Sequence, residues 1–147
     1  MVIDDETIVS LFFDIEKLDR RYMAARKDTT LHGGQYHCIL CLFYHGNMKQ
    51  SRLAELMDVR STSLSELLGK LESKGLVERE PSARDKRTFQ VSLTSAGLEL
   101  AQKYDLTRAK SHHIMVSRLS LEEKEQFYHL LEKIKQGYLE EEENKNV

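Results

Sequence analysis

Apolar side chains recur every three or four residues along most of the chain, which is the spacing of helices that bury one face. Residues 27–34 are polar and contain glycines, so they predict a loop. Residues 35–45 are apolar on most sides and predict a buried helix that ends at Gly46. A strand is the competing interpretation of residues 35–45, because short apolar runs are ambiguous. The other predicted helices cover residues 5–27, 49–57, 61–74, 94–117 and 120–138.

One segment has the period of a strand. In residues 88–93 every second side chain is apolar, as in a half-buried strand, and residues 76–80 predict its partner. The polar and basic residues 81–87 lie between these two segments. We therefore expect a β-hairpin with a long charged tip.

Capping residues mark the ends of several helices. Gly75 is placed like the glycine that commonly follows a helix, so the helix of residues 61–74 should end there. Side-chain oxygens at a helix start accept hydrogen bonds from the first backbone N–H groups. The candidates are Asp4 or Asp5 in the first helix, Ser61 or a capping box of Ser63 with Glu66 in residues 61–74, and a box of Ser120 with Glu123 in the last helix.

Two short predicted helices, residues 49–57 and 61–74, are joined by a three-residue connector, which is the pattern of a helix-turn-helix. In that motif the N-terminal end of the second helix enters the major groove of DNA. Short polar side chains at this end could bond phosphates or base edges without blocking the approach. The candidate DNA-binding residues of this recognition helix are Arg60, Ser61, Thr62, Ser63 and Ser65.

The charged hairpin tip follows this motif directly and resembles a wing. Arg84, Lys86 and Arg87 are spaced to reach a neighbouring minor groove or the DNA backbone. A carboxylate would be repelled by DNA, so we expect Asp85 to pair with Arg87 and to fix the direction of its guanidinium. The two motifs in this order predict double-stranded DNA as the partner.

Residues 77–100, with the sequence VEREPSARDKRTFQVSLTSAGLEL, resemble the wing signature of the MarR family of bacterial and archaeal transcription regulators. The segment SRLAEL, residues 51–56, is similar to the first helix-turn-helix element of that family. The resemblance covers roughly residues 35–100. The matching pieces are Gly75-Leu76-Val77, Arg79, the Asp85-x-Arg87 tip, and Leu93-Thr94 with Gly97.

The resemblance implies a homodimeric repressor that reads a pseudo-palindromic operator and is modulated by a small-molecule effector. It places Ser61, Thr62 and Ser65 at the start of the recognition helix that contacts bases and phosphates. Arg87 corresponds to the wing arginine that enters the minor groove and Asp85 to its partner, with Arg84 and Lys86 as backbone contacts. Three residues depart from the family pattern and leave the operator sequence open: Arg60 in place of a serine cap, Glu66 in place of a basic residue, and Gly69 within the helix.

We therefore expect a mainly α fold with a small β-hairpin wing. Residues 35–94 would form the winged helix-turn-helix DNA-binding domain, and residues 1–34 and 95–147 a helical dimerisation region. The apolar stripes of the terminal helices exceed what the central module can cover, so an intertwined homodimer is the economical arrangement.

Composition limits the remaining classes. The chain has 147 residues, 31% charged and 40% hydrophobic, with a net charge of −2, which excludes a bulk polycation but not a local basic patch. Since no apolar run approaches the roughly 20 residues of a bilayer-spanning helix, we expect no membrane partner. The acidic N-terminal sequence lacks the basic region of a signal peptide, and two cysteines are too few for a disulfide framework. We expect a cytoplasmic protein.

The two cysteines leave three interpretations open. Cys38 and Cys41 lie one turn apart on the predicted buried helix, where they could simply pack as small hydrophobic side chains. They could also form a redox sensor. A zinc site is the third interpretation, because His37, Cys41 and His45 share one helical stripe and His112 and His113 could complete the ligand set.

Two further function classes are alternatives to a transcription regulator. A winged-helix module could bind protein through its hairpin, although three basic residues at the tip disfavour this. The sequence has no glycine-rich phosphate loop and no Ser/His/Asp or paired-carboxylate arrangement, so we expect neither an enzyme nor a resident cofactor. An effector pocket would be apolar and aromatic, with Phe12, Tyr22, Tyr36 and Tyr104 as conceivable lining residues.

Overall fold

The computed structural model describes residues 3–26 and 31–145. Within these ranges the chain is mainly helical with a small antiparallel sheet, which confirms the predicted fold class. The elements are α1 (Asp5–Ala24), α2 (Gly33–His45), β1 (Met48–Lys49), α3 (Gln50–Met57), α4 (Ser61–Ser73), β2 (Val77–Pro81), β3 (Phe89–Leu93), α5 (Ser95–Val116) and α6 (Leu121–Lys145).

The chain divides within α5 into two compact units, Met1–Ala109 and Lys110–Val147, and each is described by itself. In the first unit α2, α3, α4 and the sheet pack around one apolar core. Burying a large aliphatic side chain contributes about 1.5–3 kcal/mol, so this core is the main source of stability in the unit. The most deeply buried side chains are Tyr36, Cys38, Ile39, Leu53, Leu64, Leu68, Leu71 and Val91.

Residues 35–45 form a buried helix, as the first interpretation of that apolar run predicted. The helix begins earlier than expected, at Gly33, because the backbone N–H of His32 donates to Oε1 of Gln35 at 3.2 Å and closes the first turn. The predicted loop of residues 27–34 is therefore shorter at its end, and its residues 27–30 lie outside the described part of the chain.

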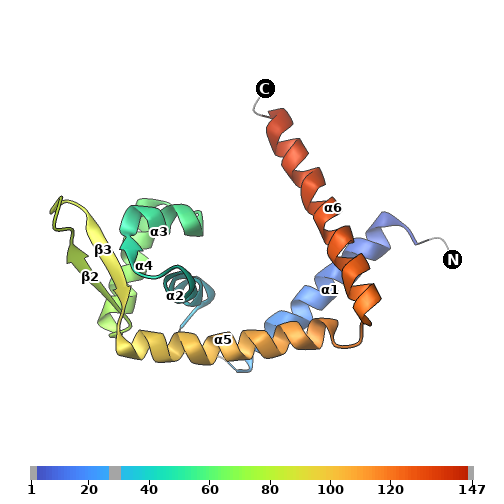
Figure 1. The fold of residues 1–147 in the computed structure, drawn as a ribbon, viewed down its shortest axis with the longest axis horizontal. Helices are drawn as coiled ribbons and strands as arrows, with labels where there is room; N and C mark the ends of the chain where they lie inside the picture. The colour runs from blue at the N-terminus through green and yellow to red at the C-terminus, as the bar shows by residue number, and fades with distance from the viewer. Residues whose placement is uncertain (1–2, 27–30, 146–147) are drawn as a thin grey trace. The chain divides into compact units, whose positions relative to one another are not determined.

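The sheet has the order β1-β3-β2, so β3 is central. The hairpin register pairs Val77 with Leu93 and Pro81 with Phe89. Pro81 lies on the edge strand, where a residue without an N–H is tolerated. In Figure 1 the hairpin lies beside α4, and its tip projects away from the helices of this unit.

Two features of the sheet differ from the sequence expectation. Strand β1, which pairs with β3 through Met48 and Lys49, was not predicted, since two residues are too few to show a period. Phe89 keeps an exposed fraction of 40%, although the alternation grouped it with the buried Val91. Phe89 pairs near the tip of the hairpin, beyond the helices that cover the other end of the strand.

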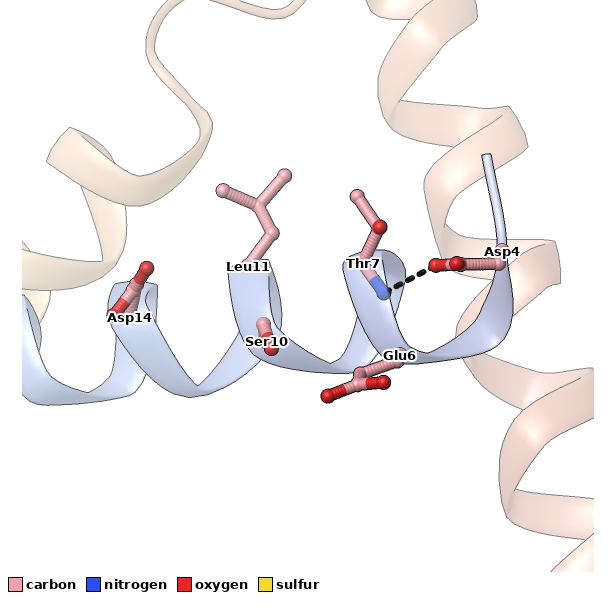
Figure 2. Close-up of a pocket in the computed structure, with 6 residues that line it drawn as sticks. All are labelled: Asp4, Glu6, Thr7, Ser10, Leu11 and Asp14. Carbon is pink, nitrogen blue, oxygen red and sulfur yellow. Dashed lines mark hydrogen bonds between the residues drawn. The ribbon is translucent and has the colours of Figure 1, made fainter. Parts of the chain in front are cut away.

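Several helix ends follow the predicted capping residues. Asp4 caps α1, and its Oδ1 accepts a hydrogen bond from Thr7 N at 2.9 Å (Figure 2). Hydrogen bonds from the Thr7 hydroxyl and backbone N–H hold the pKa of Asp4 below its usual value. Helix α4 ends at Ser73, and Gly75, with φ +70°, follows its C-cap Lys74. Helix α6 begins with the box in which Ser120 N donates to Glu123 at 2.8 Å.

The predicted cap of α4 is wrong. The N-cap is Arg60, whose extended backbone (φ −70°, ψ 147°) lets its carbonyl accept from Leu64 N at 3.0 Å. Ser61 therefore occupies the first helical position, and Ser63 lies too far inside the helix to cap it with Glu66. Arg60 is the N-cap because its carbonyl already accepts the first intrahelical hydrogen bond, and the left-handed Asp58 (φ 52°) lies in the turn before it.

The terminal helices expose apolar side chains. In α1 Met23 is buried, whereas the apolar stripe is exposed at Ile8, Leu11, Phe12, Ile15 and Leu18. In α6 no described residue is buried, and the exposed apolar residues include Phe127, Leu130, Leu131, Ile134 and Tyr138. A helix with an apolar stripe normally buries it against another element. Among the described helices, none combines the length and the apolar character needed to cross a bilayer.

Candidate nucleic-acid interface

The connector between α3 and α4 is a tight, hydrogen-bonded turn. Asp58 N donates to Glu55 O and Val59 N donates to Ala54 O, each at 3.1 Å. Asp58 is in the left-handed conformation, which aspartate adopts more readily than most residues. The helix-turn-helix is therefore a compact unit whose second helix is α4.

The two faces of α4 differ sharply. Leu64, Leu68 and Leu71 are fully buried in the core, so the orientation of the helix is set by packing. Its N-terminal end lies at the surface, where unpaired backbone N–H groups and the helix dipole favour a phosphate. The side chains exposed at this end are Arg60, Ser61, Thr62 and Ser63, whereas Ser65 is half-buried.

The hairpin tip is closed by hydrogen bonds that centre on Asp85. Its Oδ1 accepts from Arg87 N at 3.0 Å, and its backbone carbonyl accepts from Thr88 N at 3.0 Å. Ser82 N donates to Thr88 O at 2.7 Å across the base of the tip. The tip is thus a defined turn, and Arg84, Asp85, Lys86 and Arg87 all lie exposed on it.

The ion pair predicted between Asp85 and Arg87 is present. Nε of Arg87 lies 3.6 Å from Oδ1 of Asp85, while the side chain of Arg87 is 95% exposed. An exposed pair at this distance contributes little to stability. The guanidinium therefore stays exposed to solvent beside the turn that Asp85 closes.

The sequence did not predict that a second arginine, Arg79, connects several elements of this unit. Arg79 on β2 bonds Glu72 and Ser65 of α4 and Gln50 of α3. Arg79 did stand out in the sequence as one of the residues that resemble the family's wing signature. Its partners, however, are 7 to 29 residues away along the chain, so the spacing of the sequence could not predict them.

The cysteines fit the interpretation as core residues. Cys38 is fully buried, and burial, with a smaller effect of Cys41, raises the pKa of its thiol to about 12. Cys41 is half-buried, and burial raises its pKa as well. A thiol with a raised pKa is a poor nucleophile at neutral pH.

The candidate zinc ligands are not brought together. His37 and His45 are exposed on α2, whereas Cys41 is half-buried. In residues 3–26 and 31–145 no group of three or more His, Cys, Asp or Glu side chains could hold a metal ion.

The four aromatic residues predicted as conceivable lining of an effector pocket do not lie together. Tyr36 and Tyr104 stack with their ring centroids 4.2 Å apart, so both belong to the packing of α2 against α5. Tyr22 instead lies beneath the guanidinium of Arg26 at 3.7 Å, and Phe12 is exposed next to Phe13.

One surface hollow lies along α1 (Figure 2). It is lined by Asp4, Glu6, Thr7, Ser10, Leu11 and Asp14. All of these residues belong to the start of one helix, and three are acidic. Effector pockets are concave and mostly apolar, so this hollow does not have the character of one.

Comparison with known proteins gives a consistent result. The sequence model of the MarR family matches residues 31–89, which span the helix-turn-helix and most of the hairpin. The HTH-type transcriptional repressor MdtR of Bacillus subtilis is 31% identical over 106 residues, covering 70% of this chain and 66% of that protein.

Solved structures agree. Staphylococcus aureus MepR bound to ethidium bromide is 26% identical, with a TM-score of 0.67 over 88% of this chain and 95% of that chain. The reduced form of MarR from Escherichia coli is 20% identical and shares the fold, with a TM-score of 0.70 over 91% of this chain and 98% of that chain. The chain therefore belongs to the MarR family of transcription regulators, which bind DNA and are not enzymes.

Proposed function

We propose that the protein is a homodimeric repressor that binds a pseudo-palindromic operator and is released by a small-molecule effector. The observation that carries this proposal is the joint exposure of the α4 N-terminus and of Arg87 within one folded unit. The N-terminal end of α4 suits a major groove, and Arg87 on the hairpin suits the adjacent minor groove. The relative MdtR is named a transcriptional repressor, which favours repression over activation.

The proposed contacts divide by chemistry. The hydroxyls of Ser61, Thr62 and Ser63 bond base edges or phosphates, while Arg60 and the half-buried Ser65 flank them. At the wing Arg87 enters the minor groove, Asp85 orients it, and Arg84 and Lys86 neutralise phosphates.

The proposed domains follow from the exposed apolar stripes. Residues 35–94 form the DNA-binding domain, and residues 1–34 and 95–147 form the dimerisation region. The stripes of α1 and α6 are each exposed on their own unit, and a second copy would cover them. A two-fold dimer presents two copies of α4, and this arrangement matches an operator with two-fold symmetry.

The effector is proposed from a relative. MepR was solved with ethidium, a planar aromatic cation. Any effector must bind the DNA-competent and the DNA-incompetent dimer with different affinities, because a ligand without that difference shifts no equilibrium.

The test begins with selection of bound fragments from genomic DNA. Because ethidium itself intercalates into DNA, its binding is measured on the protein without DNA. On a selected duplex, Arg87→Ala should raise the Kd at least about fivefold at near-physiological salt. The matched control is Arg20→Ala, which removes an exposed arginine from α1 and should leave the Kd unchanged.

Salt dependence separates DNA binding from other modes. Log K for the duplex should fall with log salt by about 0.9 per phosphate neutralised, and Lys86→Ala should reduce that slope by about one contact. An unchanged Kd for Arg87→Ala would refute the wing assignment. Failure to select any duplex would favour the protein-binding module.

A further inference from the structure

Arg79 connects three elements of the DNA-binding unit. From β2, its Nε and Nη2 both approach Oε1 of Glu72 on α4, at 2.6 and 2.5 Å. Its Nη1 lies 3.3 Å from Oγ of Ser65 on α4 and 3.5 Å from Oε1 of Gln50, the first residue of α3.

The spacing on α4 explains how one guanidinium meets two of its residues. Ser65 and Glu72 are seven positions apart, which is close to two full helical turns, so their side chains lie on one face of α4. The planar, five-donor guanidinium can bond both of them from fixed directions, whereas an ammonium group has three donors without a fixed plane. The contacts therefore hold the wing strand at one position along the recognition helix.

The arginine is not placed to contact DNA itself. Its side chain is 20% exposed and that of Glu72 is 34% exposed. Its donors already point at protein acceptors, and the ring of Phe89 lies 5.7 Å from the guanidinium carbon on the hairpin side. Arg79 thus differs from Arg87, whose side chain is almost fully exposed.

The bond to Ser65 also has a chemical consequence. A hydroxyl has one proton and two lone pairs, and Arg79 donates to one of the lone pairs. The remaining proton can then be donated outward. Ser65 would face DNA as a donor, and its partner would be an acceptor such as a phosphate oxygen or N7 of guanine.

We infer that Arg79 is a positioning residue for DNA recognition. It holds the hairpin against α4 so that Arg87 and the α4 N-terminus engage one operator together, and it presents Ser65 as a hydrogen-bond donor. This inference rests on the proposed function, because it assumes that α4 and the wing bind the same duplex.

The first test needs no DNA. Arg79→Lys keeps the charge but removes the planar guanidinium that bonds Glu72 and Ser65. The backbone amides of residues 82–88 should therefore become more mobile in ¹⁵N relaxation, while those of α2 should not change. Arg20→Lys, which weakens the exposed Arg20–Glu16 pair on α1, is the matched control and should leave the hairpin unchanged. Unchanged relaxation of the hairpin in Arg79→Lys would overturn the inference.

The second test uses the duplex selected by the wild-type protein. Arg79→Lys should raise the Kd about tenfold, since lysine does not replace a bidentate arginine. In the Arg87→Ala background, Arg79→Lys should raise the Kd less than about threefold. A displaced hairpin weakens binding less when the Arg87 contact is already absent. Equal losses in both backgrounds would indicate a general effect on stability and would overturn the inference.

Two outcomes remain to be distinguished. If Arg79→Lys does not fold, Glu72→Gln removes the charge with little change in shape and should give the same pattern of hairpin mobility and coupling. If Arg87→Ala binds like the wild type, the proposed wing contact fails. The relaxation result then still decides whether Arg79 positions the hairpin.

Discussion

At the scale of single residues, Asp85 shows how one side chain can serve both folding and recognition. Its Oδ1 accepts the Arg87 backbone N–H at 3.0 Å, and the ion pair with the Arg87 side chain is longer, at 3.6 Å. A hydrogen bond to a charged acceptor contributes more than an exposed ion pair. The shape of the turn is thus the larger contribution of Asp85.

Substitutions at Asp85 separate these two contributions. Asp85→Asn keeps an oxygen that accepts the Arg87 N–H, so operator affinity should change less than about threefold, whereas Asp85→Ala should lower it by about three- to tenfold. Titration of a labelled operator duplex measures both. If both variants lower the operator affinity by the same factor, the negative charge of Asp85 supports binding and the hydrogen bond that shapes the turn does not.

Cys38 predicts a pH dependence of stability. Burial raises its pKa from 9.0 to about 12, so between these values the unfolded state loses a proton that the folded state keeps. The contribution of Cys38 is fully present below pH 9, and it is lost as the pH rises toward 12. The free energy of unfolding should fall by up to about 1.4 kcal/mol per pH unit in this window.

Comparison with Cys38→Ala isolates this effect from the titration of lysines and tyrosines. Urea unfolding at several pH values between 9 and 12 should give a smaller slope for the variant than for the wild type. Equal slopes would show that the Cys38 thiol is accessible to water.

At the scale of elements, the end of α4 is bonded to the start of α5. The Thr94 hydroxyl donates to Gly75 O at 2.6 Å and accepts from Gly97 N at 3.1 Å, while Thr94 N donates to Leu76 O at 3.1 Å. A side chain at Gly97 would overlap the Leu76 carbonyl. The close approach needed here explains why glycine occupies position 97.

Two glycines therefore give opposite predictions. Gly97→Ala should lower the free energy of unfolding by about 1–3 kcal/mol, because the backbone of Leu76 must move. Gly69→Ala should raise it by about 1 kcal/mol, since glycine is a poor helix former. At Gly69 the described residues leave an added Cβ open space within 4 Å. Chemical denaturation measures both, and destabilisation by Gly69→Ala would contradict the assignment of open space there.

At the scale of the whole molecule, each of the two compact units exposes an apolar stripe on a terminal helix, α1 in one unit and α6 in the other. Phe12 on α1 is 54% exposed, and its apolar neighbours on that helix are similarly exposed. Exposed apolar surface of this extent usually marks an interface. A second copy of the chain is the partner proposed above.

Phe12→Glu tests that partner. A charge within the stripe should raise the dimer dissociation constant at least about 100-fold, because an unpaired charge would be buried in the interface. Sedimentation equilibrium measures the dissociation constant, and helix content by circular dichroism should stay constant. The control is Glu6→Gln, which lies at least about 120° around the helix from every residue of the stripe and should leave the dimer intact. A wild-type protein that is monomeric at micromolar concentration would refute the dimer proposal.

Much of the fold could be predicted because its signals are local. The capping box of Ser120 and Glu123, the stop at Gly75 and the helical spacing of the leucines in α4 all depend on residues within one or two turns. Backbone geometry makes such short-range patterns readable from sequence alone. The candidate DNA-contacting residues were named in the same way, from a turn between two helices and a basic hairpin tip.

The order of the helices, the hairpin and the family could therefore all be predicted from local patterns in the chain. The remaining features depend on packing in three dimensions: neither Ser61 nor Ser63 caps α4, a third strand joins the sheet, and Arg79 meets Ser65 and Gln50. Residues 14 and 29 positions apart became neighbours of Arg79 because burial of Leu64, Leu68, Val77 and Val91 brought their elements together. Contacts of this kind arise from packing across the core, which has no period along the chain.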